Sequence, residues 1–228
     1  KDGESISKKL FPNALWVEYV DAGFTLCMVL KNRIDAYKKS TGRIPKIIML
    51  KNHGIFVSGN TAEEIRSLYA DVMESLRLEY HRHGIREELQ ITETEREYEL
   101  EYKIGSFFGE DAAFIQSSGF FQCAIGPLTP DHLVYARAYP FTEELTKENV
   151  EVYREKHGFA PKVVVQKDRV YGLGRTEKNA RLALLFAQDG AQVLQLSQAF
   201  GGVEYMTVRA REFIENWEVE SYREKVAS

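Results

Sequence analysis

The stretch that decides the fold is residues 45–64, PKIIMLKNHGIFVSGNTAEE. Residues 46–50 form a short apolar run, which is typical of a strand covered on both faces. Residues 51–54 predict a turn, and residues 55–57 predict a second strand. Thr61 lies three residues before a glutamate, a pattern that predicts a capping box at the start of a helix. The stretch therefore predicts a strand, a turn, a strand and a helix in this order.

The flanking residues extend this pattern in both directions. Residues 14–19, ALWVEY, are rich in aromatic and β-branched side chains and predict a short strand. A helix is expected to open at Gly23 and to end at Gly42, with the apolar face Leu26, Val29, Leu30, Ile34 and Tyr37. The helix after Thr61 is expected to end at Gly84, with the apolar face Ile65, Leu68, Tyr69, Val72 and Leu76.

The same pattern recurs later in the chain. Residues 31–51 align with residues 147–167, and the shared positions are Lys31, Tyr37, Gly42, Pro45, Lys46 and Lys51 with Lys147, Tyr153, Gly158, Pro161, Lys162 and Lys167. After the deletion of one residue, Gly59 and Thr61 align with Gly174 and Thr176. The order of helix, strand, turn and helix is kept, which indicates a duplicated supersecondary unit. Convergence of two ordinary α/β units is the alternative.

The regions around the repeat are less regular. Residues 85–110 are charge-dense and predict a solvated connector between a first part, residues 1–84, and a second part, residues 111–228. Thr92 with Glu95 predicts a helix cap within the connector. Residues 105–118 are expected to be irregular and residues 120–125 to form a strand; residues 207–227 are expected to form a last helix, anchored by Phe213, Ile214, Trp217 and Tyr222.

Composition narrows the class of protein. The chain has 30 basic and 34 acidic residues and a net charge of −4, which argues against nucleic-acid binding. Two cysteines cannot form a disulfide framework, so a reducing, cytoplasmic location is expected. The longest charge-free stretch, residues 112–130, is broken by glycine, proline and polar residues, so no membrane partner is expected. The start of the chain shows no signal-peptide pattern.

His53 is the most informative of the five histidines. It follows a buried-type strand directly and lies beside a glycine, and strand ends of α/β sheets are where sites are built. A neutral imidazole there could bind zinc through one nitrogen, and a turn histidine with an ordinary hydrogen bond is the alternative. His81, His83 and His157 lie near helix C-termini, where they favour the helix dipole, and His132 is expected in a turn.

Other motifs carry weaker signals. The stretch Gly172-Leu173-Gly174 resembles the start of a dinucleotide fingerprint, but its third glycine position is Glu177. No phosphate-binding P-loop and no nucleophile elbow is visible in the sequence. Neither cysteine has a basic neighbour that would lower its pKa.

Residues 51–64 resemble the class II aldolase/adducin family. In that family the His-Gly pair after a buried strand carries the third zinc-binding histidine, so the resemblance implies that His53 is a zinc ligand. Residues 16–26 are similar to a segment of rhamnulose- and fuculose-phosphate aldolases. The resemblance implies that Tyr19 reaches the active site of a neighbouring subunit and transfers a proton there, which in turn implies a homo-oligomer.

Residues 128–132 and 161–174 resemble the long subgroup of this family. Its members are similar to the rhamnulose-1-phosphate aldolase part of bifunctional aldolase/short-chain dehydrogenase proteins. The resemblance implies a three-layer α/β/α fold with a predominantly antiparallel or mixed central sheet. It also implies a partial first unit, residues 1–84, followed by a degenerate second copy. Asp168 and Arg169 stand where the first copy has His53 and Gly54, so the second copy is expected to be non-catalytic.

The family's other site residues cannot be found in this chain. Its His-x-His zinc pair, catalytic glutamate and phosphate-binding residues lie upstream of the Tyr19 segment. We therefore expect the C-terminal part of a zinc-dependent lyase, with the remaining ligands and the N-terminal part outside this chain. The expected reaction is the cleavage of a small phosphorylated sugar, a ketose 1-phosphate such as rhamnulose 1-phosphate, to dihydroxyacetone phosphate and an aldehyde. The alternatives are a pentulose-phosphate 4-epimerase and a non-catalytic adducin-like interaction module.

Overall fold

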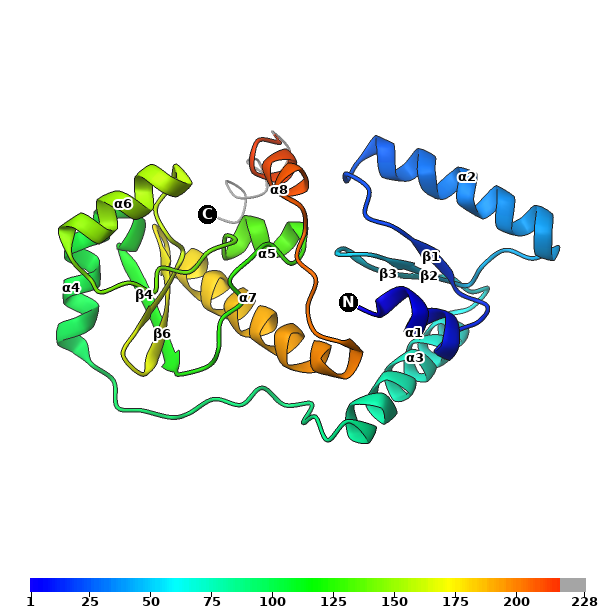
Figure 1. The fold of residues 1–228 in the computed structure, drawn as a ribbon, viewed down its shortest axis with the longest axis horizontal. Helices are drawn as coiled ribbons and strands as arrows, with labels where there is room; N and C mark the ends of the chain where they lie inside the picture. The colour runs from blue at the N-terminus through cyan, green and yellow to red at the C-terminus, as the bar shows by residue number, and fades with distance from the viewer. Residues whose placement is uncertain (218–228) are drawn as a thin grey trace. The chain divides into compact units, whose positions relative to one another are not determined.

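A computed structural model describes residues 1–217 of the chain (Figure 1). The fold is mixed α/β, with about 51% helix and two small sheets, which confirms the predicted α/β class. The chain divides into two compact units. Unit 1 comprises Lys1–Glu87 and Leu196–Glu204, and unit 2 comprises Glu88–Gln195 and the residues from Tyr205 onward. No helix within residues 1–217 is long and apolar enough to cross a membrane.

Unit 1 contains a three-stranded sheet in the order β1-β2-β3. Strand β1 runs parallel to β2, and β3 runs antiparallel to β2. The elements are α1 (Gly3–Leu10), β1 (Leu15–Val17), α2 (Phe24–Thr41), β2 (Ile47–Leu50), β3 (Gly54–Val57), α3 (Ala62–Arg82) and the short 3-10 helix η2 (Ser197–Phe200).

Local sequence signals set the helix ends of unit 1 as predicted. Gly42 adopts the left-handed conformation after α2, with φ of 72°, and its N–H donates to Lys38 O. The Thr61 hydroxyl accepts a hydrogen bond from Glu64 N at 3.1 Å. The Glu64 carboxylate accepts from the backbone of Asn60, at 2.7 Å, rather than from Thr61 itself. The capping box is therefore present, with its reciprocal bond displaced by one residue.

The buried cluster of unit 1 is small and lies on one side of β2. It consists of Val17, Leu26, Ile48 and Leu50, with Leu15, Val20, Val29, Leu30 and Ile34 packed against it. Strand β2 alternates between half-buried and buried residues. The prediction of a strand covered on both faces is therefore met fully on the face of Ile48 and Leu50 and in part on the other face, where the Ser7 hydroxyl of α1 donates to Met49 Sδ at 3.1 Å.

Unit 2 contains an antiparallel three-stranded sheet in the order β4-β6-β5. Every residue of the central strand β6 is buried. The elements are α4 (Tyr98–Phe108), the 3-10 helix η1 (Gly109–Ala112), β4 (Phe114–Gly119), α5 (Pro130–Tyr135), α6 (Lys147–His157), β5 (Val163–Gln166), β6 (Arg169–Gly174), α7 (Glu177–Leu196) and α8 (Val208–Glu215).

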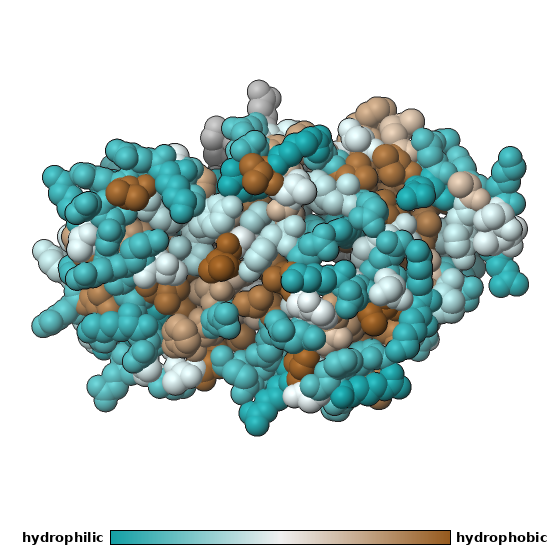
Figure 2. Space-filling model, viewed as in Figure 1, coloured by the Kyte–Doolittle hydropathy of each residue, from teal (hydrophilic) through white to brown (hydrophobic). Residues whose placement is uncertain are grey.

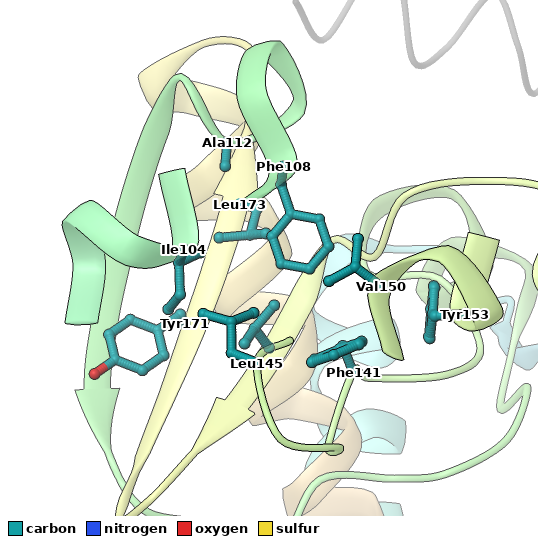
Figure 3. Packing of buried hydrophobic residues seen from close by; sticks show 10 residues of the cluster. Ile104, Phe108, Ala112, Phe141, Leu145, Val150, Tyr153, Tyr171 and Leu173 are labelled. Carbon is teal, nitrogen blue, oxygen red and sulfur yellow. The ribbon is translucent and has the colours of Figure 1, made fainter. Parts of the chain in front are cut away.

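The main core of unit 2 lies between its sheet, α4 and α6 (Figure 3). Phe141 is fully buried there, and its ring meets those of Phe108 and Tyr153 edge-on, with centroids 5.7 and 5.6 Å apart. The complete cluster is Ile104, Phe108, Ala112, Phe141, Leu145, Val150, Tyr153, Val164, Tyr171 and Leu173. A second cluster joins the other side of this sheet to α7 through Val170, Ala187 and Ala191.

The Gly172-Leu173-Gly174 stretch serves helix–sheet packing. A Cβ atom on Gly172 would lie 2.4 Å from Ala180 O, and one on Gly174 would lie 2.3 Å from Ala180 N. Glycine at both positions therefore allows α7 to lie directly on β6. This packing accounts for the two glycines that sequence reasoning compared with a dinucleotide fingerprint.

The two units repeat one arrangement of elements. The order α2-β2-β3-α3 in unit 1 matches α6-β5-β6-α7 in unit 2. Gly158 caps α6 in the left-handed conformation as Gly42 caps α2, and the Thr176 hydroxyl accepts from Asn179 N as Thr61 does from Glu64 N. The deleted residue falls in the hairpin turn, which is residues 51–53 in unit 1 and residues 167–168 in unit 2.

Several local predictions between the repeats are wrong. Thr92 caps no helix, because its backbone pairs with Phe120 through two hydrogen bonds, and α4 begins only at Tyr98. Residues 105–118 are not irregular, since they hold the end of α4, η1 and most of β4. The strand expected at residues 120–125 is β4, six residues earlier; its Gln-Ser-Ser sequence gives little strand signal, and pairing with β6 fixes it instead.

Two further predictions concern His132 and the end of the chain. His132 lies in α5 rather than in a turn, and its side chain is buried. The last helix, α8, is shorter than predicted; Ile214 is buried in it, whereas Phe213 and Trp217 are half-buried. Tyr222, the fourth predicted anchor, lies outside the described residues.

The buried aromatic core of unit 2 gives a stability prediction. Phe141→Ala should lower the free energy of unfolding by about 3–5 kcal/mol, because it leaves a cavity between Phe108 and Tyr153. Phe114→Ala in β4 is the matched control, since that ring is 46% exposed, and should cost about 1 kcal/mol or less. Urea unfolding of both variants measures the difference. Equal losses would show that Phe141 is not part of a tightly packed core.

The two thiols should differ sharply in reactivity. Cys27 is exposed on α2, whereas burial raises the pKa of the Cys123 thiol to about 12. A thiol reacts as its thiolate, so at pH 8 a chromogenic disulfide reagent should modify Cys27 quickly and Cys123 only after unfolding. Mass spectrometry of the labelled native chain checks this. Rapid modification of Cys123 in folded protein would contradict the burial described here.

Candidate functional site

The structure brings the segments of Tyr19 and His53 to the same end of the unit 1 sheet, where strands β1 and β2 finish. Strands β1 and β2 are parallel, with Val17 opposite Leu50, so their carboxyl ends lie together. Lys51 N donates to Val17 O at 3.0 Å and continues this pairing beyond the strands. Tyr19 follows β1, and His53 lies in the turn after β2. Strand ends of this kind are a usual location for sites in α/β proteins.

The turn that carries His53 has a defined backbone. Asn52 adopts a left-handed conformation with φ of 52°, which asparagine tolerates better than most residues. Its side-chain amide donates to Glu204 O at 2.8 Å, and His53 N donates to Leu50 O at 3.2 Å. The His53 side chain is exposed. The turn therefore presents the imidazole to solvent from a backbone held at two points.

A small charge cluster borders this turn. The Lys51 ammonium lies 2.8 Å from Glu204 Oε1 and 3.5 Å from Glu18 Oε2. The hydrogen bond that Lys51 donates to the Glu204 carboxylate, aided by the charge of Glu18, raises the pKa of Lys51 above its usual value. Glu18 also accepts a hydrogen bond from Trp16 Nε1 at 2.7 Å. Partly exposed pairs of this kind contribute little stability, so their effect here is to orient the groups at the strand ends.

Tyr19 differs from His53 in its surroundings. Its residue is half-buried, and its hydroxyl oxygen is buried within this chain. Transfer of a proton by this hydroxyl to a ligand would therefore require the side chain or its cover to move.

The described residues alone do not fit a catalytic zinc site. Residues 1–217 contain no group of three or more His, Cys, Asp or Glu side chains that could hold a metal ion. A catalytic zinc ion takes three protein ligands and keeps one open position, and His53 supplies one nitrogen.

The other histidines have local structural partners. His81 Nε2 lies 3.2 Å from Glu87 Oε1, and His83 Nδ1 lies 3.0 Å from Glu79 O at the end of α3. His132 Nδ1 lies 2.7 Å from the Thr129 hydroxyl, and its Nε2 lies 3.1 Å from Asp189, whose pKa the contact lowers. These contacts agree with the structural interpretation of His81 and His83.

The corresponding turn of unit 2 is built differently. Arg169, at the position of Gly54, is buried, and its guanidinium donates to Thr94 O and, at 3.3 Å, to the Ser117 hydroxyl. The Thr94 hydroxyl donates to Asp168 O at 3.0 Å. The turn is thus attached to residues of its own unit, and Asp168 stands where unit 1 presents His53.

Sequence reasoning missed a hollow in unit 2 of about 420 Å³. Tyr139, Tyr153, Lys156, His157 and Arg211 line it, from segments far apart in the sequence. Burial, followed by the charges of Lys156 and Arg211, lowers the pKa of His157 and so favours its neutral imidazole. The Tyr139 hydroxyl accepts from Arg211 Nη1 at 3.2 Å. No single sequence motif joins these residues, because they come from segments far apart in the chain.

No family model and no curated protein matches this chain. The relation to class II aldolases therefore stays a prediction from the residues quoted above.

The backbone of the His53 turn gives a prediction. Asn52→Ala should destabilise the turn by about 1–2 kcal/mol more than Asn52→Gly, because alanine is strained at positive φ and glycine is not. Both variants lose the same side-chain bond to Glu204 O, so the comparison isolates the backbone term. Amide exchange of His53 and Gly54 measures it. Equal exchange in the two variants would rule out a left-handed Asn52.

Proposed function

We propose that this chain is the C-terminal part of a class II aldolase. The full protein would cleave a ketose 1-phosphate, such as rhamnulose 1-phosphate, to dihydroxyacetone phosphate and an aldehyde. One observation carries the proposal. Two separate segments that resemble this family, around Tyr19 and His53, follow the carboxyl ends of the adjacent strands β1 and β2 in unit 1. Agreement of two sequence signals in one place is more informative than either signal alone.

The proposal assigns different tasks to the two units. Unit 1 presents an exposed histidine from a defined turn, and unit 2 has a shorter turn with a buried arginine. This difference supports a degenerate, non-catalytic second copy. The proposal includes the three-layer α/β/α fold with a partial first unit, a cytoplasmic location and a homo-oligomer.

The proposal gives each site residue a limited role. His53 would supply one nitrogen to a zinc ion whose other ligands lie outside this chain, together with the catalytic glutamate and the phosphate-binding groups. Tyr19 would act as general acid or base at the active site of a neighbouring subunit. Lys51, with Glu18 and Glu204, would hold the strand ends in register beside the turn.

Zinc content tests the role of His53. In the longer polypeptide that includes the N-terminal part, His53→Ala should weaken zinc binding by at least about tenfold, because one of three protein ligands is lost. His81→Ala is the matched control, since His81 is also exposed and has a carboxylate partner in Glu87. It should leave zinc content unchanged. Unchanged zinc binding in His53→Ala would remove the metal assignment.

Product analysis separates the enzymatic alternatives. The longer polypeptide should split rhamnulose 1-phosphate into dihydroxyacetone phosphate and an aldehyde. A product that keeps the whole carbon chain of a pentulose phosphate would point to the 4-epimerase instead. A longer polypeptide that binds no zinc and converts neither substrate would favour the adducin-like interaction module.

A further inference from the structure

Unit 1 leaves apolar side chains exposed on both β3 and α3. Phe56 in β3 is 50% exposed, and Tyr69 and Met73 in α3 are 41% and 55% exposed. Large apolar side chains also reach the surface among the polar ones in the view of Figure 2. Single exposed apolar residues are ordinary, but these three belong to two packed elements whose counterparts in unit 2 are covered.

The counterpart of Phe56 shows what is missing over the sheet. Phe56 pairs with Ile48 across the β2–β3 hairpin, and Tyr171 pairs with Val164 across the β5–β6 hairpin. Tyr171 is fully buried and shares a cluster with Ile104 from α4 (Figure 3). Unit 1 has no described element in the place of α4, so the equivalent ring stays exposed.

The open edge of β3 shows what is missing beside the sheet. Ser58 N donates to Lys46 O, so by the alternation of an antiparallel ladder the N–H groups of Ile55 and Val57 point away from β2. Within residues 1–217, β3 is paired with β2 alone. In unit 2 the equivalent edge of β6 pairs with β4 over six residues. An unpaired strand edge of this kind is a template for another strand.

Helix α3 supplies an independent third observation. With Thr61 aligned to Thr176, Met73 corresponds to Gln188 in α7. The Gln188 side chain donates to the Ser118 hydroxyl of β4 at 3.4 Å. The Met73 position therefore faces the place that a strand would take beside β3.

We propose that unit 1 binds a helix followed by an antiparallel β-strand, which pairs with β3 and covers Phe56, Tyr69 and Met73. The occupant is a segment of the same polypeptide that precedes Lys1. This proposal rests on the proposed function in one respect, that the chain is part of a longer polypeptide. It concerns assembly of the sheet and uses no part of the catalytic assignment. Main-chain hydrogen bonds along β3 would give the binding energy, and the apolar side chains would give the register.

The order of the helices and strands along the chain indicates which segment would pair with β3. In unit 2, α4 and β4 come before α5 and before Phe141, which pairs in parallel with Val164 of β5. In unit 1 the same parallel pairing is made by Leu15 of β1 with Ile48 of β2. The repeat therefore puts the missing helix and strand before β1. Only α1, Gly3–Leu10, lies between Lys1 and β1, and it corresponds in order to α5.

Amide hydrogen exchange tests the proposal on two polypeptides, the 228-residue chain and the longer one with its natural upstream segment. In the 228-residue chain at low concentration, the Ile55 and Val57 amides should exchange rapidly. In the longer polypeptide they should exchange at least about 100-fold more slowly. Val170 and Gly172, which face β4, are internal references and should be protected in both.

Three results would overturn the proposal. The first is slow exchange of Ile55 and Val57 in the monomeric 228-residue chain. The second is fast exchange of both amides in the longer polypeptide. The third is protection in the 228-residue chain that rises with its concentration, which would assign the edge to a second copy.

A charge on α3 gives a second test. Met73→Glu should return the Ile55 and Val57 exchange rates in the longer polypeptide towards those of the 228-residue chain. In the 228-residue chain itself it should change neither rate. Val152→Glu on α6 is the matched control, because that side chain is 54% exposed and no missing element is inferred over it. Equal effects of the two variants in the longer polypeptide would refute a buried environment for Met73.

Discussion

The close packing of α7 on β6 is the contact on which unit 2 depends. Gly172 and Gly174 carry no side chain, and a Cβ at either would lie within 2.4 Å of the backbone of Ala180. With the helix this close, β6 is buried along its whole length and can serve as the central strand. Strand β4 then pairs with its free edge, and α4 and α6 cover the other face through Phe108 and Tyr153, which pack against Phe141. Burial of this apolar surface is the main stabilising term of the unit.

Unit 1 uses the same order of elements with fewer elements around its sheet. Its hairpin, β2–β3, and its two helices match those of unit 2 in order, in the left-handed caps at Gly42 and Gly158, and in the threonine caps. Because nothing described corresponds to α4 and β4, its buried cluster is small and β3 keeps an open edge. The same supersecondary unit is thus present twice. In unit 2 strand β4 extends its sheet, and in unit 1 no described strand does so beside β3.

The candidate site follows from strand direction. Parallel pairing of β1 with β2 brings the segments of Tyr19 and His53 to the same end of the unit 1 sheet, although more than thirty residues separate them in the chain. Tyr19 and His53 could be chosen as candidate site residues from the local sequence, because a strand, a turn and a glycine are local features. The surroundings of these two residues could not be predicted in this way, since the contacts of Lys51 and Asn52 with Glu204 join distant parts of the chain. The hollow lined by Tyr139, His157 and Arg211 escaped prediction for the same reason.

The sequence by itself determined the helix caps at Gly42, Thr61, Gly158 and Thr176, both hairpins and the repeat, because these depend on residues within a few positions of one another. Tertiary structure alone decided β4, whose polar Gln-Ser-Ser run becomes a strand only beside β6, and the burial of His132 in α5. It also decided that Gly172 and Gly174 serve packing. In each case the deciding partner lies far away in the sequence, where local propensity and periodicity carry no information.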